Sequence, residues 1–338
     1  MREQGKAEKK IMLAELCRTF GINLDLALEA REIVRGETGA EIPGVQVEKE
    51  RYDAAEVTVV RIVEPYAEKL MGKPVGTYIT IEAPVIRENN PPAHQEVTEI
   101  LARHLTPFVN VPPFANILVV GLGNWRATPD SLGPKVCEMT VVTRHLFNYA
   151  PQALKEGMRS VSALAPGVLG ITGIETAEII RGVVEKIRPE LIIAIDALAA
   201  RSVTRIGTTI QIADTGISPG SGIGNQRAGI NRETMGVPVI ALGIPTVAHA
   251  AVIAQDTLDR FFEQSRSNPA LFNLYQGAGR ESAQQVIREV LEPFGGNLTV
   301  TPKEIDSLID TAARIVAGGI TLALHPNLTP DEYSFYLH

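Results

Sequence analysis

The sequence lacks several features that would place it in well-known classes. It has only two cysteines, Cys17 and Cys137, among 338 residues, too few for the disulfide framework of a secreted domain. It has no apolar run of about 18 residues, so we expect no membrane-spanning helix. The charged stretch Met1–Lys10 lacks the apolar core of a secretory signal. We therefore expect a cytoplasmic protein from a reducing compartment, with no membrane partner.

Excess positive charge is also lacking. The formal net charge is -7 and the sequence pI is near 5.5, which argues against direct nucleic-acid binding. The chain has no Gly-x-Ser-x-Gly elbow and no His-Glu-x-x-His zinc motif. Gly121 and Gly123 could open a dinucleotide fingerprint, but Arg126 stands where its third glycine belongs. We therefore expect no bound cofactor and no resident metal ion.

The chain is nevertheless rich in apolar residues, which make up 45% of the sequence and suffice for a large core. Four short apolar runs are typical of buried strands, namely residues 117–120, 191–195, 208–212 and 238–242. Such strands, separated by helices, predict an α/β fold with a mostly parallel sheet that has helices on both faces. Two β-branched segments, Glu56–Val63 and Gly76–Ala83, predict additional β-rich structure near the N-terminus.

Helical patterns separate and follow these strands. The expected helices cover residues 95–105, 132–147 and 175–188. Thr172 and Glu175 have the spacing of a capping box at the start of the third helix. Thr301 and Glu304 repeat that spacing and predict the start of a last long helix.

Two aspartates follow apolar strands, at the edge where open parallel sheets bind their ligands. Asp196 comes directly after the run 191–195, and Asp130 closes the glycine-rich loop that follows the run 117–120. Each aspartate alone could cap a helix or anchor a turn, but the two together favour catalysis. Candidate substrate-binding residues in the two glycine-rich loops at this edge are Asn124, Ser221 and Gly222.

Two neighbouring carboxyl groups have a well-defined chemistry. Like charges a few ångströms apart cannot both ionise cheaply, so the pair shares one proton. The ionised member then activates a water, and the neutral member donates to the carbonyl oxygen and the leaving amine. The same carboxylates could instead hold a metal ion that activates the water. A noncatalytic binding protein on the same fold is the third alternative.

Three long segments of the chain are distinctive: GLGNWRATPDSLGPKV at residues 121–136, AIDALAARS at 194–202 and IADTGISPGSGIGN at 212–225. These segments resemble the germination protease family of bacterial spores. The resemblance extends over nearly the whole chain after Asn23 and includes residues 161–176, 238–247 and 301–306. Members of this family are endopeptidases that degrade small acid-soluble spore proteins during germination.

The resemblance implies an atypical aspartic peptidase that is made as a self-processing zymogen and assembles as a homotetramer in the spore core. The two catalytic aspartates of the family fall on Asp130 and Asp196. The implied sheet is of the phosphorylase and hydrogenase-maturation-peptidase type. Two positions depart from the family pattern, because Ser218 stands where relatives have His and His249 stands where they have a carboxylate.

The N-terminus resembles a propeptide. Residues 1–25 contain an apolar stripe from Ile11 to Phe20 that could cover the cleft, and residues 26–338 form a single peptidase domain in this interpretation. Cleavage sites in spore proteins resemble Glu-(Phe/Ile)-Ala-Ser-Glu. The segment Asp25-Leu26-Ala27-Leu28-Glu29 repeats that order of acid, bulky apolar, small, any and acid. We therefore expect self-cleavage at the Asp25–Leu26 bond.

Overall fold

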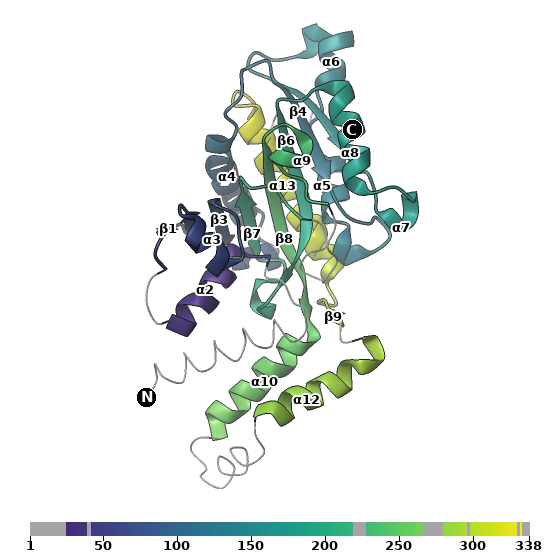
Figure 1. Cartoon of the computed structure of the whole chain (residues 1–338). Helices are drawn as coiled ribbons and strands as arrows, with labels where there is room; N and C mark the ends of the chain where they lie inside the picture. Colours follow the sequence, from purple (N-terminus) through teal and green to yellow (C-terminus); the bar gives the residue numbers. More distant parts are fainter. Residues whose placement is uncertain are drawn as a thin grey trace.

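The computed structural model describes residues 25–38, 42–218, 228–265, 280–295, 298–329 and 332. Its centre is one nine-stranded sheet with the order β1-β2-β3-β7-β8-β6-β4-β5, and β9 pairs with β8 outside this order (Figure 1). The strands are β1 (Val45–Arg51), β2 (Glu56–Ile62), β3 (Gly76–Glu82), β4 (Asn116–Gly121), β5 (Ser160–Leu164), β6 (Leu191–Ala200), β7 (Thr209–Ala213), β8 (Val239–His249) and β9 (Thr299–Val300). The predicted α/β class is confirmed.

The sheet is mixed, so the prediction of a mostly parallel sheet is wrong in this respect. β4 is parallel to β5 and β6, and β6 is parallel to β8. The pairs from β1 to β7 and from β7 to β8 are antiparallel. A strand that runs parallel to the preceding one needs a connection of about a dozen residues or more to return to the starting end of the sheet, and only residues 201–208 lie between β6 and β7, which flank β8. The chain therefore turns back, and the expected N-terminal strands extend the same sheet.

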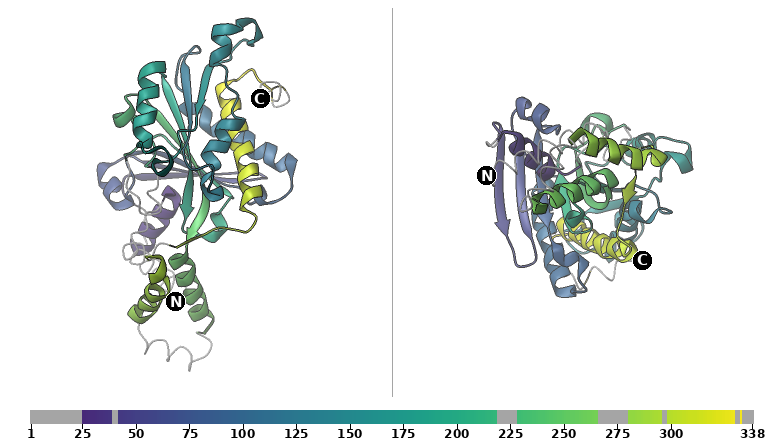
Figure 2. Two further views of the ribbon diagram at one scale, coloured as in Figure 1. Left: turned by 90° about the vertical axis from the view of Figure 1, so that its right-hand side faces the viewer. Right: turned by 90° about the horizontal axis from the view of Figure 1, so that it is seen from below.

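One face of the sheet packs against α4 (Pro91–Leu105), α5 (Leu132–Met139) and α13 (Ile305–Leu324), which is yellow in Figure 2. Alternate strand residues such as Val119 and Ile193 point to this face and pack with Ile320 of α13. α13 is long and apolar enough to cross a bilayer, but 72% of its apolar window is buried inside the protein. We therefore interpret it as a core helix, whose first half carries exposed polar residues such as Asp306 and Arg314 and whose second half, from Ile315 on, is buried on nearly all sides.

The opposite face carries the candidate site. It is covered by α2 (Ala27–Thr38), α3 (Pro65–Met71), α8 (Thr176–Ile187) and α9 (Arg232–Met235). Ile180 of α8 belongs to a core cluster with Val120 and Ile192 of the strands, while Ala27 of α2 belongs to another with Ala213. Helices on both faces are thus confirmed, and α2 brings the start of the described chain onto the sheet.

The predicted helix over 132–147 is in fact two helices, α5 and α6 (Arg144–Tyr149), with a break between them. At the break the Thr140 hydroxyl donates back to the Val136 carbonyl. The Thr143 hydroxyl instead accepts the Val161 N–H of β5. Threonine hydroxyls compete with helix hydrogen bonds in this way, and a contact with a distant strand ends the helical run.

Neither predicted capping box forms. Glu175 and Glu304 are themselves the N-cap residues of α8 and α13, without side-chain cap hydrogen bonds. The Thr172 hydroxyl bonds within its own turn, and the Thr301 hydroxyl donates to the Thr246 carbonyl of β8. A threonine hydroxyl takes whichever backbone partner the tertiary structure brings close, so spacing alone was a poor guide.

Beyond the sheet, α10 (Ala250–Ser265) and α12 (Arg280–Leu291) lie side by side (Figure 1). α10 follows β8 directly, and Ile33 of α2 packs against Val252 and Ile287 of this pair. Short elements complete the described chain: α7 (Leu169–Thr172), η1 (Pro84–Arg87), η2 (Thr106–Phe108), η3 (Thr128–Asp130), η4 (Pro151–Ala153), η5 (Val203–Arg205) and η7 (Glu292–Phe294).

Candidate active site

A cavity of about 300 Å³ lies between β6, the end of β8 and the loop after β4. Three aspartates line it, and they come from three parts of the chain: Asp25 from the segment before α2, Asp130 from η3 and Asp196 from β6. Ile217 and Val247 contribute apolar lining. The structure thus brings the two candidate catalytic residues into one cavity, together with one residue of the predicted cleavage site.

Asp196 lies inside a strand. The prediction placed it just after a strand, but β6 continues to Ala200. The side chain is almost fully buried, and Oδ1 accepts the N–H of Ala197 at 2.9 Å. Burial raises the pKa of Asp196 well above 3.8, the charges of Asp130 and Asp25 raise it further, and the Ala197 N–H opposes the rise. Asp196 therefore stays neutral to higher pH than an ordinary aspartic acid.

Asp130 is positioned by the glycine-rich loop. Its Oδ2 accepts the Asn124 N–H at 2.9 Å, which holds the side chain in place. Gly123 has φ +116, and a Cβ there would lie 2.0 Å from the Asp130 carbonyl oxygen, so the turn requires glycine. A Cβ on Gly121 would lie 2.0 Å from the Gly133 carbonyl oxygen of α5. These glycines therefore let the loop and α5 approach closely around Asp130.

Gly243 separates Asp196 from Gln211 across the sheet. The strand register pairs Asp196 with Gly243, and Gly243 with Gln211. Residues opposite one another share a face, so both polar side chains point to the α2 face, about 10 Å apart at two strand spacings. Leu198 fills part of the room that the glycine leaves, because a Cβ on Gly243 would lie 2.5 Å from its Cδ1.

The protein's own Asp25–Leu26 segment lies at this face. Oδ2 of Asp25 accepts the Ala199 N–H at 2.9 Å, beside a shift in the register of β6 on β8. The carbonyl oxygen of Asp25 accepts two hydrogen bonds, each 3.0 Å long, from Lys73 Nζ and Gln211 Nε2. The Leu26 side chain is fully buried. The peptide bond of the predicted cleavage site is therefore held by contacts on its carbonyl and on both flanking side chains.

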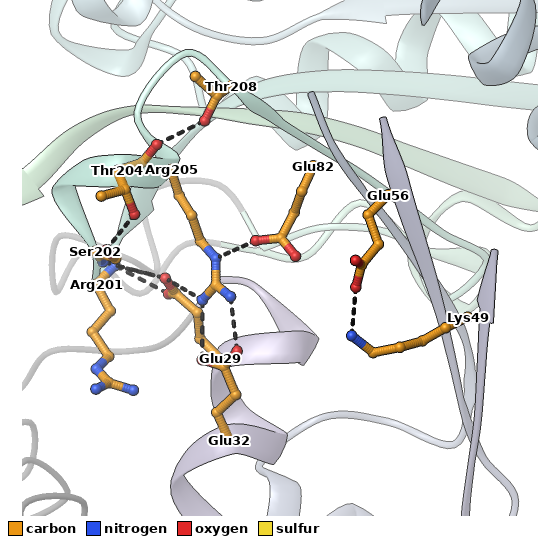
Figure 3. A network of polar contacts seen from close by, with 10 residues as sticks. All are labelled: Glu29, Glu32, Lys49, Glu56, Glu82, Arg201, Ser202, Thr204, Arg205 and Thr208. Carbon is orange, nitrogen blue, oxygen red and sulfur yellow. Dashed lines mark hydrogen bonds and ion pairs between the residues drawn. The ribbon is translucent and has the colours of Figure 1, made fainter. Parts of the chain in front are cut away.

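A second acidic residue of the same segment has its own pocket (Figure 3). Glu29 is fully buried and accepts the backbone N–H groups of residues 201 and 202 and the Arg205 guanidinium. The guanidinium also pairs with Glu32 and Glu82. Burial raises the pKa of Glu29, and the Arg205 charge and the N–H groups oppose the rise. An acid four residues after Asp25 thus meets two backbone N–H groups and the Arg205 guanidinium, which it shares with Glu32 and Glu82.

The candidate substrate-binding residues have different outcomes. Asn124 is half-buried, and its side-chain Oδ1 accepts the Arg126 N–H. Its contact with the cavity is made by its backbone N–H, which donates to the Asp130 carboxylate. Ser221 and Gly222 lie outside the described residues, as does the predicted apolar stripe before residue 25. Their role therefore stays a prediction.

The two positions that depart from the family pattern also differ from each other. Ser218 lines the cavity. His249 is buried at the end of β8, where its Nδ1 accepts the Ala251 N–H at the start of α10. Only Ser218 therefore lies where a side chain could contact a bound peptide at this cavity.

Three polar residues at the site were missed by sequence analysis: Lys73, Gln211 and Arg205. Gln211 stood out in one respect, because it interrupts an otherwise apolar strand. Lys73 follows Gly72, which ends α3 in the left-handed region at φ 60, and nothing local distinguishes it from other lysines. Their roles depend on contacts with α2 and its preceding residues, which no local pattern reveals.

The arrangement can support acid–base chemistry on a peptide. A buried carboxyl group with a raised pKa lies beside a second carboxylate, in a cavity that receives a piece of chain. Among the residues that the structure describes, no group of three or more His, Cys, Asp or Glu side chains could hold a metal ion. Fold and site together define an α/β protein with a buried carboxyl pair at a cavity that holds a segment of peptide chain.

Comparison with known proteins identifies the family. A model of the germination protease family matches residues 24–267 and 262–337. Germination proteases of Caldanaerobacter subterraneus subsp. tengcongensis, Clostridium tetani and Bacillus pumilus are 49%, 44% and 42% identical to the chain. Each alignment covers 94% of this chain and 99%, 100% and 97% of the respective relative. The chain belongs to the germination protease family, which confirms the resemblance and makes it a protease of spore germination.

Proposed function

We propose that this protein is an endopeptidase that begins the degradation of small acid-soluble spore proteins, using Asp130 and Asp196 to hydrolyse peptide bonds. One observation carries the proposal. The Asp25–Leu26 segment, which repeats the substrate pattern, lies at the cavity that both aspartates line. The protein's own chain thus occupies the place that a substrate would take. Membership of the germination protease family supports protein substrates independently.

The two aspartates have different environments and therefore different proposed roles. Asp130, whose carboxylate accepts the Asn124 N–H, is the general base that takes a proton from water as the water oxygen attacks the carbonyl carbon. Asp196, which burial keeps neutral, is the general acid that gives its proton to the leaving nitrogen as the C–N bond breaks. Transfer of the proton from Asp130 to Asp196 then restores the pair.

The uncut chain is a zymogen in this proposal, with residues 1–25 as propeptide and 26–338 as the peptidase domain. It is silent in this proposal because Asp25 lies at the cavity and takes the Ala199 N–H that the acid of an external substrate would need. Processing at this bond removes Asp25 together with its contact to Ala199. A free N-terminus at Leu26 then allows the first turn of α2 to leave, because the segment has lost its anchor in the cavity.

We expect peptides with an acid before the scissile bond to be cleaved with a kcat/KM about 10- to 100-fold higher than peptides with its amide, since a hydrogen bond to a charged group contributes about 1.5–3 kcal/mol. The Ala199 N–H that holds the Asp25 carboxylate is the physical basis. The matched pair is a peptide containing Glu-Phe-Ala-Ser-Glu and one containing Gln-Phe-Ala-Ser-Glu, with products identified by mass spectrometry. Equal rates for the two peptides would contradict this acid subsite.

Cleavage should survive a strong chelator, with a rate within about twofold of the untreated enzyme, because carboxyl groups supply both the base and the acid. The measurement is peptide cleavage after incubation with EDTA, and the control is EDTA already saturated with magnesium. Loss of activity that a divalent ion restores would overturn the metal-free chemistry. It would favour the same carboxylates acting as ligands of a metal ion.

We also propose that the protein works in the spore core as a homotetramer. An exposed apolar stripe formed by Val286, Val290 and Phe294, with exposed fractions of 56%, 67% and 58%, supports assembly through the α12 region. Val286 and Val290 are four residues apart on one side of α12, and Phe294 follows in η7, so these exposed apolar side chains could be covered by a partner subunit. Light scattering of the uncut chain measures the assembly, and a monomer at micromolar concentration would contradict it.

A further inference from the structure

We propose that Lys73 and Gln211 form the oxyanion-binding site of this enzyme. The inference rests on the proposed function, in which Asp25–Leu26 is the bond that is cut. The carbonyl oxygen of Asp25 then belongs to the scissile bond, and it is the atom on which negative charge develops during hydrolysis. Lys73 Nζ and Gln211 Nε2 each donate to this oxygen at 3.0 Å. Two donors fixed on the developing charge are the defining geometry of an oxyanion hole.

The Gln211 amide is fixed from both ends. Its Nε2 donates to the Asp25 carbonyl, and its Oε1 accepts the Ala27 N–H at 2.7 Å. These two contacts bracket Leu26 and determine which amide atom faces the scissile carbonyl. Gln211 is itself 8% exposed, so water competes little for the donor. A preorganised donor of this kind does not have to reorient as charge appears, which is why such groups accelerate reactions.

Lys73 brings a positive charge to the same oxygen. It follows Gly72, the left-handed residue that ends α3. Burial lowers the pKa of Lys73, and the negative charges of Asp25 and Glu29 oppose this change. An ammonium group removed from water interacts more strongly with a developing oxyanion than a solvated one does. Lys73 would therefore stabilise the tetrahedral intermediate more than the neutral carbonyl of the substrate.

The sheet register places this pair on the same face as the candidate acid. Gln211 lies two strands from Asp196, with Gly243 between them. The Asp25 side chain, held by Ala199 of β6, and the Asp25 carbonyl, held by Gln211 of β7, bridge that distance. The scissile carbonyl therefore has oxyanion donors from β7 and from the residue that follows the C-cap of α3, and Asp25 lines the same cavity as Asp130 and Asp196.

This arrangement divides the chemistry between four side chains. The water oxygen forms a bond to the Asp25 carbonyl carbon, Asp130 takes the water proton, and the carbonyl π electrons move onto the oxygen. Lys73 and Gln211 stabilise that oxyanion by hydrogen bonds. When the electrons return, the C–N bond breaks and the nitrogen of Leu26 receives the proton of Asp196. Asp196 is thus not needed to polarise the carbonyl, and its proton is reserved for the leaving amine.

The two residues could instead only anchor the segment, and the test separates these roles. Gln211→Glu keeps an acceptor for the Ala27 N–H but removes the donor and adds a negative charge beside the oxyanion. Lys73→Met removes the charge at similar length, and Lys73→Arg keeps it. Lys69→Met, on the exposed side of α3, is the matched control. The full-length chain is used throughout. The readouts are the single-turnover rate of N-terminal processing and hydrogen exchange at residues 26–30, which reports docking.

We expect Gln211→Glu and Lys73→Met to slow processing by about 10²- to 10³-fold, the usual effect of losing one oxyanion donor. Exchange at residues 26–30 should stay as slow as in the wild type for Gln211→Glu. Lys73→Arg should recover part of the rate, and Lys69→Met should match the wild type.

Two outcomes would overturn the oxyanion role. One is processing within threefold of wild type in both Gln211→Glu and Lys73→Met. The other is a rate loss that appears only together with faster exchange at residues 26–30, which would mark both residues as anchors. The proposed function fails differently, through processing that persists in Asp196→Asn. A wild-type chain that is never cut at Asp25–Leu26 would remove both proposals together.

Discussion

Replacing either Asp130 or Asp196 by Asn is expected to reduce peptide cleavage by at least about 10³-fold, because a concerted acid–base pair loses nearly all activity with one member. Asparagine keeps the shape of the side chain but cannot exchange a proton at neutral pH. The measurement is the initial rate on the Glu-Phe-Ala-Ser-Glu peptide, with every variant prepared as residues 26–338 so that blocked processing does not itself lower the rate. Asp53→Asn, an exposed carboxylate between β1 and β2, is the control and should leave the rate unchanged. Near-wild-type cleavage by Asp130→Asn or Asp196→Asn would refute the pair.

Asp196→Asn should also stabilise the fold at neutral pH. The pKa of Asp196 is raised in the folded protein above its ordinary value of 3.8, chiefly by burial. The stability that protonated Asp196 contributes is therefore complete below pH 3.8 and is lost as pH rises through the pKa of Asp196 in the folded protein. Asp196→Asn escapes this loss and should raise the free energy of unfolding by about 1–3 kcal/mol at pH 8. Thermal melts of both proteins at pH 4 and pH 8 measure the difference, which should widen with pH.

The raised pKa of Asp196 also sets the sign of the pH dependence of cleavage. The general acid must be protonated, so the rate should fall as pH rises through the folded pKa of Asp196. Mildly acidic pH therefore favours cleavage, until the general base is protonated as well. A rate that rises steadily from mild acid to pH 8 would contradict a protonated Asp196 as the acid.

Incubation of the full chain at mildly acidic pH is expected to produce a single new N-terminus at Leu26. The reason is geometric, since the Asp25–Leu26 bond is already held at the cavity by Ala199, Lys73 and Gln211. N-terminal sequencing identifies the new residue, and intact mass measures the loss of residues 1–25. We expect an all-or-none difference: the wild type loses residues 1–25, and Asp196→Asn keeps its original mass under the same conditions.

A mixing experiment completes this test. Asp196→Asn is incubated with a small amount of processed wild-type enzyme, which reveals whether one molecule can cut another. We expect little cutting, because the bond lies in its own molecule's cavity and Leu26 is fully buried. A new terminus elsewhere than Leu26 would reject the cleavage site. Equal processing of Asp196→Asn alone would reject self-cleavage.

Much of the fold could be predicted because its causes are local. The runs 117–120 and 191–195 are strands in the structure, and so are the β-branched segments of β2 and β3. The direction of each strand in the sheet was harder to predict, because an apolar run has the same composition in a parallel and in an antiparallel strand. β7 reverses only because the connection from β6 is short, and β6 itself runs past Asp196 because Ala197 to Ala200 continue to pair with β8.

The candidate site was predictable where the type of a residue and its place after a strand suggest its chemistry. Asp130 and Asp196 stood out as carboxylates beyond apolar strands, and they do share a cavity. Lys73 and Arg205 did not stand out, because a surface lysine or arginine and one in a binding site look alike in sequence. Gln211 differed only in lying within an apolar run, which does not identify a binding role. What distinguishes them is the partner that the fold supplies.

The sequence by itself determined the α/β class, the family and the two aspartates, since each depends on residue type and spacing along the chain. The pattern Asp25-Leu26-Ala27-Leu28-Glu29 could also be recognised there, but not its location. Only the tertiary structure brought the Asp25 carbonyl to Lys73 and Gln211, which are 48 and 186 positions away. The physical reason is that a strand register and the docking of α2 set these contacts, and both depend on the burial of apolar faces from distant segments.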